Sequence, residues 1–173
     1  PSGFNLSDST ASHYLGSKQN LYARFKYSFG NRISYGITGQ KDAGEEFFKG
    51  SQPKGFDFYS SHFYYKGEKF IRTLALGDYQ LQAGQGLVLW SGLSFSKSAD
   101  VINICKISRG LQPYRSANEN LFLRGAATTI HIQKFDITAF VSHKKLDANY
   151  IPFDTLTNEE ASFNSFITSG LHR

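Results

Sequence analysis

The sequence predicts an all-β protein built from antiparallel hairpins that form a barrel or part of one. Segments in which apolar and polar residues alternate with a period of two dominate the chain. Aromatic residues, which favour strands, make up 16% of the sequence, with 16 Phe and 10 Tyr. Short turn signals separate several of the alternating segments, as expected for hairpins.

The first hairpin shows how turn length can be tested by register. From Asn20 to Phe29 apolar residues occupy every second position, and the alternation resumes at Ile33. A two-residue loop would pair Phe29 with Arg32 and place apolar residues of one strand on the polar face of the other. A three-residue loop, Gly30 to Arg32, pairs Phe29 with Ile33 and keeps the faces aligned. We therefore predict the three-residue loop.

Two further hairpins are predicted from two-residue turns. Gly77-Asp78 would join a strand over Phe70–Leu76 to a strand over Tyr79–Leu89, with Leu76 opposite Tyr79. Gln133-Lys134 would join Leu121–Ile132 to Phe135–His143, with Ile132 opposite Phe135. The other expected elements are strands over Phe56–Lys66 and Ser162–Arg173, loops over Asp42–Gly55 and Asp147–Ala161, and a long excursion over Ser91–Asn120 with a short helix at Ser98–Cys105.

The length of 173 residues fits a single β domain covering residues 1–173. The chain opens at Pro1 and contains no methionine, so we expect it to be a fragment of a longer protein. The net charge is +5, but the 19 Lys and Arg residues are scattered, which is far from a nucleic-acid-binding pattern. Cys105 is the only cysteine, which excludes an internal disulfide and a cysteine metal cluster.

Strands of this length with one apolar face fit two architectures. One is a soluble sandwich or barrel with an apolar interior. The other is an outer-membrane barrel with apolar residues toward lipid and a polar lumen. Tight turns that alternate with long loops, aromatic residues near strand ends and glycines within strands (Gly36, Gly39, Gly84, Gly86, Gly125) favour the membrane type.

The stretch from Leu76 to Asn149 resembles a family of large envelope proteins of Gram-negative bacteria. The resemblance covers about half the chain and rests on short blocks in the same order, namely Leu76-Gly77-Asp78-Tyr79, Gly84-Gln85-Gly86-Leu87, Ser96-Lys97-Ser98-Ala99-Asp100, Arg109-Gly110-Leu111-Gln112-Pro113-Tyr114, Asn118-Glu119 and Leu123-Arg124-Gly125-Ala126-Ala127. Members of that family carry N-terminal helix-hairpin-helix motifs and are often labelled as related to DNA-uptake proteins. The resemblance implies a C-terminal β-barrel-like region in the outer membrane. It implies no catalytic residues, and the DNA-binding label does not carry over because this chain lacks the helix-hairpin-helix motif.

We find no catalytic, cofactor-binding or metal-binding constellation in the sequence, and we predict that the protein is not an enzyme. The five histidines show no metal-site spacing. One stretch combines cations with aromatic residues and supplies the candidate loop or polyanion contacts Lys97, Arg109, Tyr114, Arg115 and Arg124. The interpretation we favour is structural: Arg109 and Arg115 pair with Asp100 and Glu119 and hold the excursion in place.

The sequence thus leads us to expect an outer-membrane β-barrel module with a structural, transport or interaction role in the envelope of a Gram-negative bacterium. Its expected partners are membrane lipid, other envelope proteins and the remainder of its own longer chain. The alternative is a soluble β domain that binds a polyanion, either nucleic acid or an anionic glycan. Detergent dependence distinguishes the two.

Overall fold

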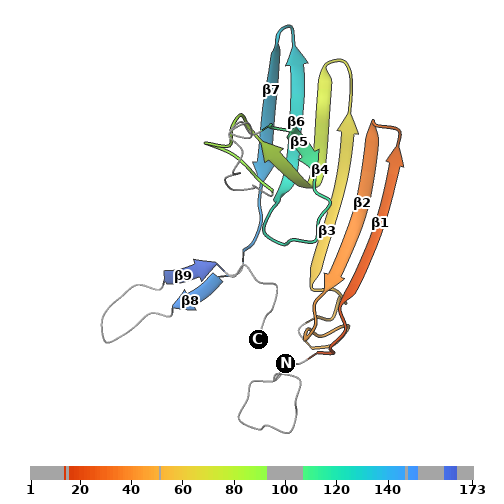
Figure 1. Cartoon of the computed structure of the whole chain (residues 1–173), viewed down its shortest axis with the longest axis vertical. Helices are drawn as coiled ribbons and strands as arrows, with labels where there is room; N and C mark the ends of the chain where they lie inside the picture. Colours follow the sequence, from red (N-terminus) through yellow and green to blue (C-terminus); the bar gives the residue numbers. More distant parts are fainter. Residues whose placement is uncertain are drawn as a thin grey trace, which may run out of the picture.

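The computed structural model describes residue 14 and residues 16–50, 52–92, 107–146, 148–151 and 162–166. All regular secondary structure in these ranges is β-strand, which confirms the all-β prediction. One antiparallel seven-stranded sheet has the order β1-β2-β3-β4-β6-β7, with β5 paired to β4, and a separate hairpin holds β8 and β9 (Figure 1). The strands are β1 (Leu21–Phe29), β2 (Ile33–Lys41), β3 (Phe58–Lys66), β4 (Ile71–Gln82), β5 (Gly110–Pro113), β6 (Leu123–Ile132), β7 (Phe135–Ser142), β8 (Ala148–Ile151) and β9 (Ser162–Phe166).

Two predicted hairpins are confirmed in register. Phe29 lies opposite Ile33, so the β1–β2 loop has three residues, and the Arg32 amide donates to the Phe29 carbonyl at 3.3 Å. Ile132 lies opposite Phe135 across the two-residue turn between β6 and β7. In both hairpins a shift of one residue would have mixed the apolar and polar faces.

The predicted hairpin at Gly77-Asp78 is wrong, because β4 runs without a turn from Ile71 to Gln82. Gly77 has the positive φ of 85° that a turn would need, but the chain continues in the same direction there. Leu76 is 43% exposed and Tyr79 is 0% exposed, so these two residues lie on opposite faces of one strand instead of facing each other in two. The turn that precedes β4 lies in residues 67–70.

The predicted strand over Tyr79–Leu89 also ends early, at Gln82. Gly84 and Gly86, expected inside a strand, have φ values of 53° and 81° and form a turn, in which the Gly86 amide donates to the Ala83 carbonyl at 3.0 Å. The predicted loop at 42–55 is present apart from an isolated bridge, and the excursion contains β5. The helix expected at Ser98–Cys105 lies outside the described residues.

The connections differ sharply between the two ends of the sheet. The three tight turns, at residues 30–32, 67–70 and 133–134, lie together at one end (Figure 1). The long connections between β2 and β3, between β4 and β6, and after β7 all leave from the opposite end. The chain therefore has a short-turn end and a long-loop end.

One face of the sheet is apolar, and no other element of the described residues packs over it; we call it the apolar face. A row of paired residues crosses six strands on this face, from Tyr27 in β1 to Val141 in β7. The large exposed side chains of this face are Phe25, Tyr27, Phe29, Tyr35, Ile37, Tyr59, Phe63, Leu76, Ile132, Phe135, Ile137 and Val141. Solvent thus reaches the side of the sheet on which the hydrophobic periodicity placed the apolar residues.

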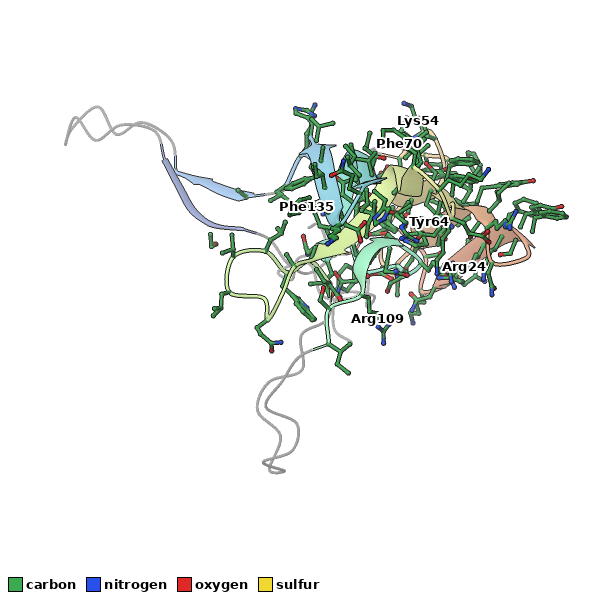
Figure 2. The ribbon with its side chains drawn as sticks, turned by 90° about the horizontal axis from the view of Figure 1, so that it is seen from above. Arg24, Lys54, Tyr64, Phe70, Arg109 and Phe135 are labelled. Carbon is green, nitrogen blue, oxygen red and sulfur yellow. The ribbon has the colours of Figure 1, made fainter. Side chains whose placement is uncertain are left out.

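The opposite face carries the packed core, and we call it the covered face. Figure 2, seen from above, shows β5 on the same side of the sheet as Arg24 and Tyr64. The Tyr64 hydroxyl donates to the Leu111 carbonyl of β5 at 3.3 Å. One core cluster here consists of Tyr64, Ala75, Tyr79, Leu81, Leu111 and Ala127. Small polar residues of the same face, Ser34, Thr38 and Ser60, are also buried.

Candidate functional site

The sheet contains a split between β3 and β4. Backbone pairing of these strands ends at His62 opposite Gly77, and from Tyr79 onward β5 takes the place of β3 beside β4. Glycine is required at position 77, because a Cβ there would lie 2.3 Å from the Ser61 carbonyl oxygen. The close approach and the positive φ together turn β4 away from β3 at this point.

An ion pair between Asp78 and Arg124 fills this split. The Arg124 guanidinium donates to both carboxylate oxygens of Asp78, from Nε at 2.6 Å and from Nη2 at 2.9 Å. Nη2 also donates to the Tyr59 carbonyl at 2.7 Å, and the Asp78 carboxylate accepts from the Ser61 amide at 3.3 Å. The two side chains thus bond the β3 backbone groups that β4 no longer reaches. Asp78 is 1% exposed, so its charge depends on this partner.

Tyr114 anchors the segment that follows β5. Its amide donates to the Asp78 carbonyl at 3.0 Å, and its ring stacks on Phe122 with centroids 4.6 Å apart. Phe58 completes this buried cluster. The Tyr114 hydroxyl donates to the Asn118 carbonyl, and burial raises the pKa of this phenol. Lys144 lies 3.9 Å above the Phe122 ring, and burial followed by the charge of Arg124 lowers the pKa of its ammonium group.

A second group of cations lies over β1–β3 on the covered face. Arg24 and Lys26 are two residues apart in β1 and share this face, opposite Thr38 and Gly36. The Arg24 guanidinium donates to the Arg115 carbonyl at 2.5 Å, which ties the segment after β5 to the far edge of the sheet. Arg24, Lys26 and Arg115 all lie close enough to His62 to act electrostatically on its imidazole, as does Asp78. Within the described residues no ion pair is recorded for these three cations.

The structure divides the five residues that the sequence singled out. Arg124 forms the forked ion pair and Tyr114 belongs to the core, so neither is a free docking residue. Arg109 and Arg115 are exposed, and among the described residues no ion pair of either side chain is recorded. Lys97 lies outside the described residues, as does Asp100, which was a predicted partner. The sequence analysis did not identify Arg24 or Lys26 as candidate site residues. The sequence of β1 contains no signal that Arg24 contacts Arg115, which lies 91 residues further along the chain.

The histidines are distributed over separate surroundings. His62 lies 3.3 Å from the Ser34 hydroxyl and packs against Gly36, where a Cβ would be 2.9 Å from its ring. His131 pairs with Asp136 at 2.6 Å in the β6–β7 hairpin. No group of three His, Cys, Asp or Glu residues able to hold a metal ion occurs in the described part of the chain. His13, His172 and Cys105 fall outside it.

A buried acid marks the long-loop end. The Glu45 side chain accepts from the Asp42 amide at 2.8 Å and is 8% exposed as a residue. Burial raises the pKa of Glu45 to about 7, and the nearby charges of Asp57, Asp42 and Glu119 act in the same direction. This group therefore titrates near neutral pH, which is unusual for a carboxyl group.

Comparisons with known proteins give no relative for the chain. No family model matches it, and neither a curated protein nor a solved structure matches it. The resemblance to the envelope protein family therefore stays a prediction. Over the described residues, no helix is long and apolar enough to cross a membrane.

Proposed function

We propose that the seven-stranded sheet is part of the wall of an outer-membrane β-barrel, with its apolar face toward lipid acyl chains. The observation that carries the proposal is the uncovered row of apolar side chains that crosses all the long strands. In soluble proteins an apolar sheet face is buried against another layer, and exposed apolar patches of this breadth are rare. Here the packed core lies on the other face.

The dimensions of the strands support the same proposal. β1, β2 and β3 have 9 residues each, and β4 has 12. Nine residues span about 30 Å along a strand, and a tilt of about 45° reduces this to about 20 Å, near the height of a barrel's apolar band. The arrangement of tight turns at one end and long loops at the other is also typical of such barrels.

The outer edges of β1 and β7 have no strand partner among the described residues. Backbone groups cannot remain unpaired in the hydrocarbon core of a membrane, so a barrel of this kind must be closed. We propose that further strands pair with both edges, supplied by the rest of a longer chain or by other envelope proteins. The function would then be structural support or passage of solutes through the envelope.

Two matched substitutions test which face meets lipid. Ile37→Arg places a charge on the apolar face, where lipid contact would cost about 2–4 kcal/mol near the midplane of the bilayer. Ser28→Arg places the same charge on the opposite face of the neighbouring strand, where we expect little effect. The readout is the fraction of full-length protein that sediments with outer membranes on a density gradient. Loss of membrane protein in Ile37→Arg alone supports the proposal, whereas a wild-type protein that is soluble and monodisperse without detergent contradicts it.

A further inference from the structure

We propose that the covered face binds small anionic solutes through Arg24, Lys26 and Arg115, at phosphate or carboxylate groups that pass along it. The proposal rests on the barrel proposed above, in which the covered face lines the lumen. It names the class of solute that such a lumen would take.

The position of Arg115 is fixed by its neighbours. Tyr114 is buried and bonded to the β4 backbone, and the Arg115 carbonyl accepts from Arg24. The backbone on either side of the Arg115 side chain is therefore held, while the side chain itself is exposed. In Figure 2, Arg24, Tyr64 and Arg109 lie on the side of the sheet where β5 lies. The segment that follows β5 thus brings a cation to the covered face.

The charge balance of this face favours an anion. The described strand positions near these cations hold hydroxyl-bearing and small residues, Ser34, Gly36, Thr38 and Ser60, in place of carboxylates. Asp78, the acid that acts on His62 together with these cations, is already bonded to Arg124. Three cations that share one face without a neutralising carboxylate raise the local concentration of anions.

The solutes that fit are small and carry a phosphate or carboxylate. Arginine binds both groups through paired donors, and lysine adds a point charge. Rings or rows of Arg and Lys give anion selectivity in known pores. An extended polyanion fits less well, because Arg124, one of the predicted contacts, is already bonded to Asp78.

The test uses the full-length protein, together with the strands that close the barrel, reconstituted in planar lipid bilayers. The ratio of chloride to potassium permeability, obtained from the reversal potential in a KCl gradient, should exceed unity. In the double variant Lys26→Gln/Arg115→Gln we expect the ratio to fall by about threefold, because two of the three charges are lost. Arg24 is kept, since it holds the segment. The control is Lys69→Gln in the exposed β3–β4 turn, which should leave the ratio unchanged.

Channels without anion preference, or a preference that the double variant retains, would overturn this inference and leave the barrel proposal standing. Failure of the chain to insert would overturn the barrel proposal, and this inference with it. If the protein inserts but does not conduct, inorganic phosphate replaces the conductance measurement. Phosphate should then raise the unfolding temperature of the wild type in detergent but not that of the double variant, and an equal response in both would contradict a site at these residues.

Discussion

Arg124 shows why one arginine in a chain of scattered cations has a structural role. Its guanidinium bonds both oxygens of Asp78 and a β3 carbonyl, and these contacts join strands whose backbone ladder has ended. Asp78 would otherwise be a buried, unpaired carboxylate. The sequence predicted forked contacts at Arg109 and Arg115 that hold the excursion. Among the described residues no ion pair is found for either side chain, and the forked contact at Arg124 of β6 joins β3 to β4 instead.

We expect Arg124→Lys to lower the free energy of unfolding by about 1.5–3 kcal/mol, because lysine cannot make the forked contact to Asp78 and also reach Tyr59. The matched control is Arg32→Lys. Arg32 likewise bonds a carboxylate, that of Glu68 at 2.7 Å, but these two side chains are 65% and 76% exposed. This exposed ion pair should contribute little to the free energy of unfolding. Urea unfolding of detergent-solubilised protein measures both, and equal losses in the two variants would contradict the role assigned to Arg124.

The raised pKa of Glu45 predicts that the stability of the protein depends on pH. Its pKa of about 7 lies above the value of 4.5 expected in the unfolded chain, so the folded state binds the proton more tightly. The stabilisation that Glu45 contributes is fully present below pH 4.5 and is lost as the pH rises through 7. Glu45→Gln should therefore unfold at a higher temperature than wild type at pH 8 and at a similar temperature at pH 4. Glu68→Gln serves as the exposed control, and an identical pH profile for wild type and Glu45→Gln would refute the prediction.

At the scale of single elements, hairpin register could be read from the sequence wherever the two faces differ. The alignment of Phe29 with Ile33 and of Ile132 with Phe135 followed from that difference. The prediction of a turn at Gly77-Asp78 was wrong, because a Gly-Asp dipeptide can form either a tight turn or a kink within a strand. Only the continuous pairing of β4 with β6 across this point distinguishes them, and that pairing joins residues far apart in the sequence.

The β6–β7 turn gives a prediction for one element. Gln133 has a φ of 56°, a conformation that costs a non-glycine residue about 1–2 kcal/mol. Gln133→Gly should therefore stabilise the protein by about 1 kcal/mol. Lys134→Gly is the matched control, because no positive φ is recorded at that position, and it should be neutral or destabilising. If Lys134→Gly stabilised as much as Gln133→Gly in urea unfolding, relief of backbone strain would not be the cause.

At the scale of the whole molecule, large apolar side chains are exposed on one face of the sheet, and the packed core lies on the other. The sequence predicted which residues share a face in β1, β2, β6 and β7, since the period of two depends only on strand geometry. It failed in β4, where Leu76 and Tyr79 lie on opposite faces. It could not predict which face the excursion covers, nor that Arg115 would meet Arg24 across the sheet. Those contacts depend on the order β1-β2-β3-β4-β6-β7, which places distant segments side by side.

Quenching of a fluorophore by lipids that carry spin labels tests the proposed membrane orientation most directly. Single cysteines at Ser34, Tyr35, Ile37 and Thr38 of β2, in a Cys105→Ser background, would be labelled and reconstituted in vesicles. We expect strong quenching at Tyr35 and Ile37 and weak quenching at Ser34 and Thr38, because only the first two lie on the apolar face. Uniform quenching, or quenching at the opposite set, would contradict the account.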